Sequence, residues 1–256
     1  MRFGTELARL LELDLLGLFV KEERLLSLVG FPFVREFDPL GGGWRPLDFD
    51  RLSHDLDLAA RSAERAFTQA AKTVPTTCRF EVVNGSMIDA IASTSRADDI
   101  VLLFGEAAST TRAETPAFMA VLDAALQSSA AVLLVPPRIA RQSGAVVAVT
   151  SGPKDQSVEI ASAIAAAAKE DLIVIEASLT KKAHLAGDAR RPIGIPHRRI
   201  VASGDRNAAA IALALCEIRE RLVVMTRGDD DIAPKIASMR QIPVLIVGPG
   251  IETLAA

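Results

Sequence analysis

Short runs of β-branched and aliphatic residues alternate along this chain with longer amphipathic stretches, and this alternation constrains the fold more than any other feature. The runs at 131–135, 145–149 and 244–247 contain no charged residue. Strands without polar alternation are typical of parallel sheets that are covered by helices on both faces. The pattern therefore predicts an α/β protein built from βαβ units.

The predicted elements form two series, separated at residues 136–144 by two prolines and a Ser-Gly pair. The first series has predicted helices at about 5–13, 49–72, 87–95 and 116–126, and strands at 15–20, 79–83, 100–104 and 131–135. The second has predicted strands at 145–149, 172–175, 199–202, 222–225 and 244–247, and helices at 156–169, 207–219 and 232–239. We expect a long loop at 21–46, in which glycines 41–43 form a flexible linker and Trp44 packs on the domain.

The two series match each other at an offset of roughly 110 to 120 residues, much longer than the period of a solenoid. Segment 83–91 corresponds to 202–211, and segment 132–136 corresponds to 244–248. We therefore interpret the chain as two tandem copies of one fold, with a first domain at 1–137 and a second at 143–250.

Several motifs that occur in a fixed order are similar to those of the universal stress protein family. In the first copy they are Gly17–Val20, Glu22–Leu26, the turn Val83–Ser86 and Ala97–Val101. In the second copy they are Val147–Gly152, Ser157 and Ile242–Val247. The resemblance implies two flavodoxin- or Rossmann-like domains, each with a parallel sheet in strand order 3-2-1-4-5.

In that strand order the last strand of each copy, 131–135 or 244–247, is an apolar edge strand that needs a cover. Members of the family usually dimerise. We therefore expect the copies to pair through these strands, either within one chain as a pseudo-dimer or between chains as a homodimer.

The first copy begins at its first helix and lacks a strand that corresponds to 145–149. That strand is central in the order 3-2-1-4-5, so its absence would leave backbone groups unpaired, at a cost of about 1 to 3 kcal/mol for each group. Three explanations remain open. The true start lies upstream, or a strand from residues 25–37 fills the position, or a partner chain supplies the strand.

The family members that bind ATP have an aspartate at the end of the first strand and a glycine-rich phosphate loop after the fourth strand. In this chain Thr150 stands at the aspartate position, and neither Gly105 nor Gly228 is followed by the second glycine of that loop. Three aspartates at 229–231 would repel phosphate. We therefore expect no cofactor and no ATP binding.

The alternative is an adenine-nucleotide sensor or weak ATPase that binds ATP or AMP in the second copy. Its site would lie at the carboxyl ends of the strands, where ligands bind in open α/β sheets. The candidate nucleotide-binding residues are Thr150, Ser151, Gly152, Gly204, Asp205, Arg227 and Gly228.

Charge and composition argue against several other classes of function. The net charge of −3 argues against nucleic-acid binding, and no apolar run reaches the length of about 20 residues that spans a membrane. Cys78 and Cys216 form no disulfide framework or metal cluster, and no hydrolase motif is present. A basic cluster at 181–199 is either a solvated loop or a docking site for an acidic partner.

We therefore expect a cytoplasmic stress-response protein that is not an enzyme and holds no metal. It would act by binding or by association with a protein partner, without nucleic acid and without membrane insertion.

Overall fold

The computed structural model divides into two compact units, residues 1–94 and residues 95–256. It describes residues 2–38, 41–104, 115–150, 152, 155–176, 197–201, 207–228 and 232–248. The division between the units falls inside the first predicted copy. The predicted domains at 1–137 and 143–250 therefore remain an interpretation of the sequence repeat.

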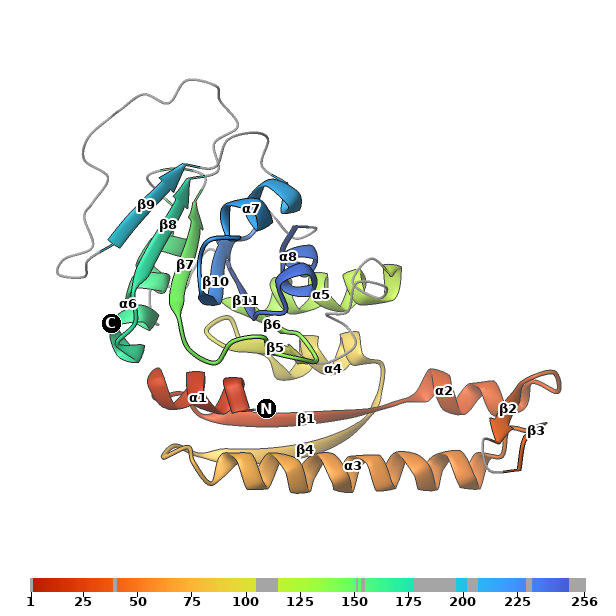
Figure 1. Cartoon of the computed structure of the whole chain (residues 1–256). Coiled ribbons are helices and arrows are strands. Elements are labelled where there is room, and N and C mark those ends of the chain that lie inside the picture. Colours follow the sequence, from red (N-terminus) through yellow and green to blue (C-terminus); the bar gives the residue numbers. More distant parts are fainter. Residues whose placement is uncertain are drawn as a thin grey trace. The chain divides into compact units, whose positions relative to one another are not determined.

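Unit 1 consists of a two-stranded parallel sheet, a β-hairpin and a long helix, with shorter helices around them (Figure 1). Its helices are α1 (Arg2–Leu10), α2 (Glu23–Ser27), the 3-10 helix η1 (Leu28–Gly30), α3 (Phe49–Ala71) and α4 (Met87–Thr94). Its strands are β1 (Leu15–Glu22), β2 (Arg35–Asp38), β3 (Gly43–Pro46) and β4 (Cys78–Gly85).

Strands β1 and β4 pair in parallel over their whole length, and α3 packs on both. The ring of Phe67 in α3 lies 5.5 Å from the ring of Phe80 in β4, measured between centroids. A Cβ atom at Gly17 in β1 would lie 2.6 Å from the Phe80 ring and 2.8 Å from the Phe67 ring. A glycine at this position is therefore required for the two aromatic rings to pack over β1.

Residues 21–46, which were predicted to form a loop, contain β1's end, α2, η1 and the antiparallel hairpin of β2 and β3. The prediction for Trp44 is wrong, because 65% of this residue is exposed and its ring contacts Phe37 across the hairpin. The hairpin also excludes one of the three explanations for the missing central strand of the first copy. Strand β2 pairs with β3, so residues 25–37 do not supply the missing central strand.

Unit 2 is a seven-stranded sheet with helices along it (Figure 1). Its strands are β5 (Ile100–Phe104), β6 (Ala131–Val135), β7 (Ala145–Thr150), β8 (Leu172–Glu176), β9 (His197–Val201), β10 (Glu220–Thr226) and β11 (Val244–Val247). Its helices are α5 (Pro116–Ser128), α6 (Ser157–Ala168), α7 (Ala208–Ala214) and α8 (Ile232–Arg240). Helix α7 was predicted to reach residue 219 but ends at Ala214, and tighter turns lead from there into β10.

The strand order of the sheet is β5-β6-β11-β10-β7-β8-β9. Within the second series this gives β9-β8-β7-β10-β11, all in parallel, which confirms the predicted order 3-2-1-4-5. The connection from β7 leads to β8, whereas the connection from β10 leads to β11, which lies in the opposite direction across the sheet. Because right-handed crossovers in opposite directions lie on opposite faces, α6 and α8 cover the two faces of the sheet. Accordingly, the residues of β11 are at most 1% exposed.

Strands β6 and β11 pair with each other in antiparallel orientation, from Leu134 opposite Val244 to Ala131 opposite Val247. The backbone N–H of Gly248 then donates to the Ala130 carbonyl at 2.8 Å. This pairing confirms that the two last strands cover each other within the chain. The described part of the chain shows β5 paired with β6 alone and β1 paired with β4 alone, so no described strand takes the central position of the first copy.

Candidate functional site

The candidate site lies at the carboxyl ends of β7 and β10, which are neighbours in the sheet of unit 2. The chain leaves β7 toward β8 on one side and leaves β10 toward β11 on the other, so the crossovers diverge at this point. Ligands of open α/β sheets bind at such a switch point, beyond the strand ends. The geometry therefore places Thr150, Gly152, Arg227 and Gly228 where the sequence predicted a nucleotide site.

Thr150 closes the turn that follows β7 by means of its own side chain. Its hydroxyl donates to the Gly152 carbonyl at 2.8 Å and accepts from the Gly152 N–H at 3.1 Å. Only 5% of Thr150 is exposed. Both hydrogen-bonding functions of the hydroxyl are therefore used by the protein itself.

Asp155 joins the strand ends to the start of α6, and it was not among the predicted site residues. One carboxylate oxygen, Oδ2, accepts from the Thr226 hydroxyl at 3.3 Å. The other, Oδ1, accepts from the Ser157 N–H at 3.0 Å, which satisfies a donor at the helix N-terminus. The fully buried Ser157 hydroxyl in turn donates to the Val149 carbonyl at 3.3 Å. An aspartate two residues before a helix is the signal that could have identified this link.

Arg227 is also engaged within unit 2. Its guanidinium Nη1 donates to the Leu126 carbonyl at 3.1 Å, and its backbone N–H donates to the Val247 carbonyl at 2.8 Å. Leu126 lies in the last turn of α5, where a cation stabilises the carbonyl end of the helix. Gly228 follows with a φ of 112°, a backbone conformation that favours glycine. This glycine therefore has a conformational reason to be present.

The network at the switch point pairs polar groups of the chain with one another. An anionic ligand would have to displace the Arg227 guanidinium from Leu126 and would meet the carboxylate of Asp155. Carboxylates and phosphates repel each other at short range. The arrangement resembles a cross-linked turn more than a phosphate cradle, and among the residues that the structure describes here no nucleophile lies beside a base.

Other predicted site residues fall outside the described residues. Ser151, Gly204 and Asp205 belong to this group, as does most of the basic cluster at 181–199.

The turn Val83–Ser86, which leads from β4 into α4, has a local structural role. Gly85 has a φ of 136°, and the Ser86 hydroxyl accepts from the Asp89 N–H at 3.2 Å. That turn therefore caps α4.

A buried ionic cluster at the opposite end of β10 was not predicted. Glu220 is 0% exposed, and its Oε1 lies 2.8 Å from Arg240 Nε and 3.1 Å from Arg141 Nη1. The hydrogen bond with Glu220 is the main cause that raises the pKa of Arg240 above its ordinary value. Nearby, Arg221 Nη1 donates to Glu170 Oε1 at 3.1 Å. Each carboxylate has a guanidinium partner, so the cluster is structural.

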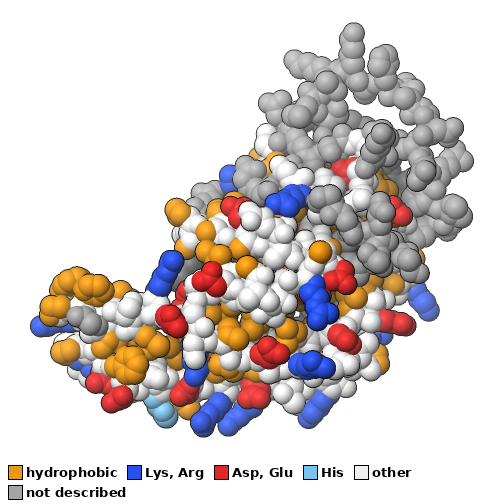
Figure 2. Space-filling view, turned by 180° about the vertical axis from the view of Figure 1, so that it is seen from behind, with side chains coloured by type: hydrophobic (Ala, Val, Ile, Leu, Met, Phe, Trp, Pro, Cys, Tyr) orange, Lys and Arg blue, Asp and Glu red, His pale blue; other side chains and the backbone are white. Residues whose placement is uncertain are grey.

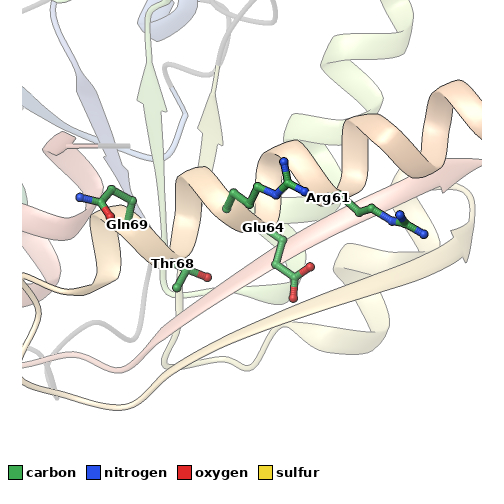
Figure 3. Close-up of a pocket in the computed structure, with 5 residues that line it drawn as sticks. Arg61, Glu64, Thr68 and Gln69 are labelled. Carbon is green, nitrogen blue, oxygen red and sulfur yellow. The ribbon is translucent and has the colours of Figure 1, made fainter.

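A further pocket lies along α3 in unit 1 and is lined by exposed side chains of this one helix (Figure 3). These residues are Arg61, Glu64, Arg65, Thr68 and Gln69. Successive turns of one exposed helix provide no enclosed wall that would exclude water from a substrate. Among the residues that the structure describes, no group of His, Cys, Asp or Glu could hold a metal ion, and no helix is long and apolar enough to cross a membrane.

Taken with the switch point, the strand order defines an α/β protein of the doubly wound class. Its fold is that of the universal stress proteins: a universal stress protein structure from Archaeoglobus fulgidus superposes with a TM-score of 0.62 at 14% identity, over 95% of this chain and 91% of that one. A structure from Pseudomonas aeruginosa, described as a candidate universal stress protein, gives a TM-score of 0.45 at 13% identity, over 94% of this chain and 96% of that one. No family model and no curated protein matches the sequence.

Proposed function

We propose that this protein is a non-enzymatic stress-response protein of the universal stress type, which acts by binding or association and does not bind ATP. The fold supports the type of protein. The observation that carries the rest is the Arg227 guanidinium, which donates to the Leu126 carbonyl at 3.1 Å and so is engaged by the chain itself. Thr150 supports the same proposal, since its hydroxyl is satisfied within its own turn.

Isothermal titration with ATP, ADP and AMP in the presence of Mg²⁺ tests the proposal. We expect no heat of binding with nucleotide in the micromolar range, and no phosphate release from ATP above that of buffer. Micromolar binding of any of the three nucleotides would overturn the proposal in favour of a nucleotide sensor.

A variant pair locates any binding that does occur. Arg227→Ala removes the side-chain cation that directly follows the carboxyl end of β10, whereas Arg65→Ala removes an exposed cation of α3 in unit 1. Nucleotide affinity that falls with Arg227→Ala and not with Arg65→Ala would assign the nucleotide to the switch point. Affinity that falls with neither variant would place it elsewhere in the chain, and in both cases the proposal that the protein does not bind ATP is wrong.

A cytoplasmic location is part of the proposal, and it is supported by the absence of disulfides between the two cysteines, which are both free. Fractionation of cells with an antibody against the protein tests it, since recovery from a membrane or secreted fraction would contradict a cytoplasmic protein.

A further inference from the structure

The hairpin of unit 1 is built with its polar face inward and its aromatic face outward. Across the two strands, Phe37 lies opposite Trp44 and Glu36 lies opposite Arg45. Because side chains alternate between the faces of a strand, these two pairs are on opposite sides of the hairpin. Arg45 Nε lies 2.5 Å from Glu36 Oε1, and Arg51 of α3 lies 3.6 Å from the same oxygen. The charged face is therefore the one turned to α3, and the aromatic face is turned to solvent.

The exposed aromatic pair belongs to a larger surface, which we call the apolar tip. It comprises seven large apolar residues between 39% and 77% exposed, all within the segment from α2 to the start of α3: Leu25, Leu28, Phe31, Phe33, Phe37, Trp44 and Phe49. The rings of Phe31 and Phe33 lie 5.5 Å apart, and those of Phe37 and Trp44 lie 5.4 Å apart. Figure 2 shows hydrophobic side chains gathered at this end of unit 1, which Figure 1 places at the α2 and hairpin end of the long strand β1.

The size of the apolar tip sets it apart from ordinary surface residues. With about 200 Å² for each aromatic side chain and slightly less for leucine, the exposed fractions amount to an apolar area on the order of 700 Å². The largest apolar patch on a typical monomer is about 300 to 600 Å². A standard protein interface buries about 800 Å² on each partner, so the tip has nearly the apolar area of one complete half-interface.

The charges around the apolar tip suit a surface that binds a copy of itself. Its exposed charged residues include Arg24 and Arg35 as well as Glu23 and Asp50. In a two-fold interface the same patch must be its own complement, and a rim that carries both signs meets this requirement. The segment from Glu22 to Arg51 contains six acidic and four basic residues, by count from the sequence, which would disfavour an anionic membrane surface.

A second molecule of this protein cannot pair through the last strands of the sheet. Those strands, β6 and β11, already pair with each other inside the chain. The edges of β6 and β11 are therefore already occupied within one chain. Association of two chains needs a separate surface.

We propose that the apolar tip is a homodimer interface, in which the aromatic faces of two hairpins pack against each other across a two-fold axis. The burial of Phe33, Phe37 and Trp44 drives the association, and the mixed charges at the rim set its orientation. The hairpin, which as an isolated two-stranded sheet has little stability of its own, gains its apolar contacts from the second copy.

The single tryptophan of the chain is Trp44, so the protein carries a reporter at the proposed interface. Sedimentation velocity from 1 to 100 µM should give a species of twice the 27.2 kDa chain mass as concentration rises. Over the same range the Trp44 emission should shift to shorter wavelength, and quenching by acrylamide should weaken.

The variant that tests the interface is Phe33→Ser/Phe37→Ser, which keeps the tryptophan. We expect its dimerisation to be at least a hundredfold weaker, while its far-UV circular dichroism stays that of the wild type because both side chains are exposed. The matched control is Leu213→Ser, which removes a 74% exposed leucine from unit 2 and should leave the dimer unchanged.

Three results would overturn the proposal. One is a wild-type protein that stays monomeric at 100 µM. A monomer that sediments with zwitterionic phosphatidylcholine vesicles also counts here, because the apolar tip would then bind lipid and not a second chain. Another is a dimer that the double variant does not weaken. The third is a dimer that the control variant weakens equally. If the double variant fails to fold, the Trp44 emission of the wild type still tests the proposal. A dimer that forms without any change in this emission would have its contact elsewhere on the chain.

Discussion

Replacement of Arg240 by methionine should strongly destabilise unit 2, because it breaks the buried ionic cluster at the start of β10. Methionine keeps much of the volume of the side chain and removes the guanidinium. The guanidinium makes three hydrogen bonds: Nε donates to Glu220 Oε1 at 2.8 Å, Nη2 to the Leu215 carbonyl at 2.9 Å and Nη1 to Cys216 Sγ at 3.9 Å.

The magnitude follows from what the substitution leaves behind. Glu220 is 0% exposed, and its second oxygen, Oε2, has no hydrogen-bond partner among the described residues. After Arg240→Met, the guanidinium of Arg141, whose side chain is 31% exposed, would be the one remaining cationic partner of the carboxylate in the part of the chain that the structure describes. Removal of one partner of a buried ion pair typically costs about 3 to 5 kcal/mol. We expect about 3 kcal/mol, because Arg141 continues to compensate part of the charge.

Hydrogen exchange followed by mass spectrometry measures this loss in unit 2 itself. A destabilisation of about 3 kcal/mol makes the slowest amides of β10 and β11 exchange about a hundredfold faster, since each 1.4 kcal/mol is a factor of ten. The double variant Glu220→Met/Arg240→Met should recover part of the loss, because an apolar replacement of a whole buried pair is often neutral. An Arg240→Met protein within about 1 kcal/mol of the wild type, with no recovery in the double variant, would show that the cluster is not the buried charge pair described above.

Three further predictions concern single positions. Asp48→Ala removes the side chain that accepts from the first turn of α3 at 2.9 Å and should cost about 1 kcal/mol in urea unfolding; no change would mean that the cap is unimportant. Gly144→Ala should cost about 2 to 3 kcal/mol in thermal unfolding, because φ is 137° and a Cβ atom would lie 2.1 Å from a backbone oxygen; a neutral result would mean that the turn relaxes freely. The hydrogen bond and charge of Lys21 lower the pKa of Asp57 below 3.8, so this pair stabilises the fold above about pH 4 and loses that effect as pH falls through the lowered pKa. Carboxyl NMR titration should show the Asp57 pKa rise in Lys21→Met, and an unchanged value would refute the pairing.

The sequence predicts the sheet of unit 2 well, for a physical reason. Strands β5, β6 and β11 begin and end at the predicted residues, because each is a continuous apolar run that a proline or a glycine follows. The order of those strands required the family resemblance, since the apolar runs alone do not specify their neighbours.

The hairpin of β2 and β3 could not be predicted from the same signal. Its strands are four residues each, and they place Phe37 and Trp44 toward solvent and Glu36 and Arg45 toward α3. This is the reverse of the pattern by which half-buried strands are identified.

The candidate site was predicted in part. Thr150, Gly152, Arg227 and Gly228 could be placed because the ends of apolar strands are visible in the sequence. The hydrogen bond from Arg227 to Leu126 joins residues 101 positions apart, and a sequence contains no local trace of such a contact. The same holds for Glu220, which as a charged residue at the start of a strand is expected at the surface and is instead fully buried.

The antiparallel seam between β6 and β11 changes what counts as an independent module in this polypeptide. The predicted domain boundary near residues 136–144 lies between β6 and β7, which belong to the same seven-stranded sheet. A chain cut at that boundary would expose the apolar edges of β6 and β11, which now cover each other. Exposed apolar edge strands favour aggregation. The residues on either side of the predicted boundary therefore share one sheet, and neither side can be removed without opening the seam between β6 and β11.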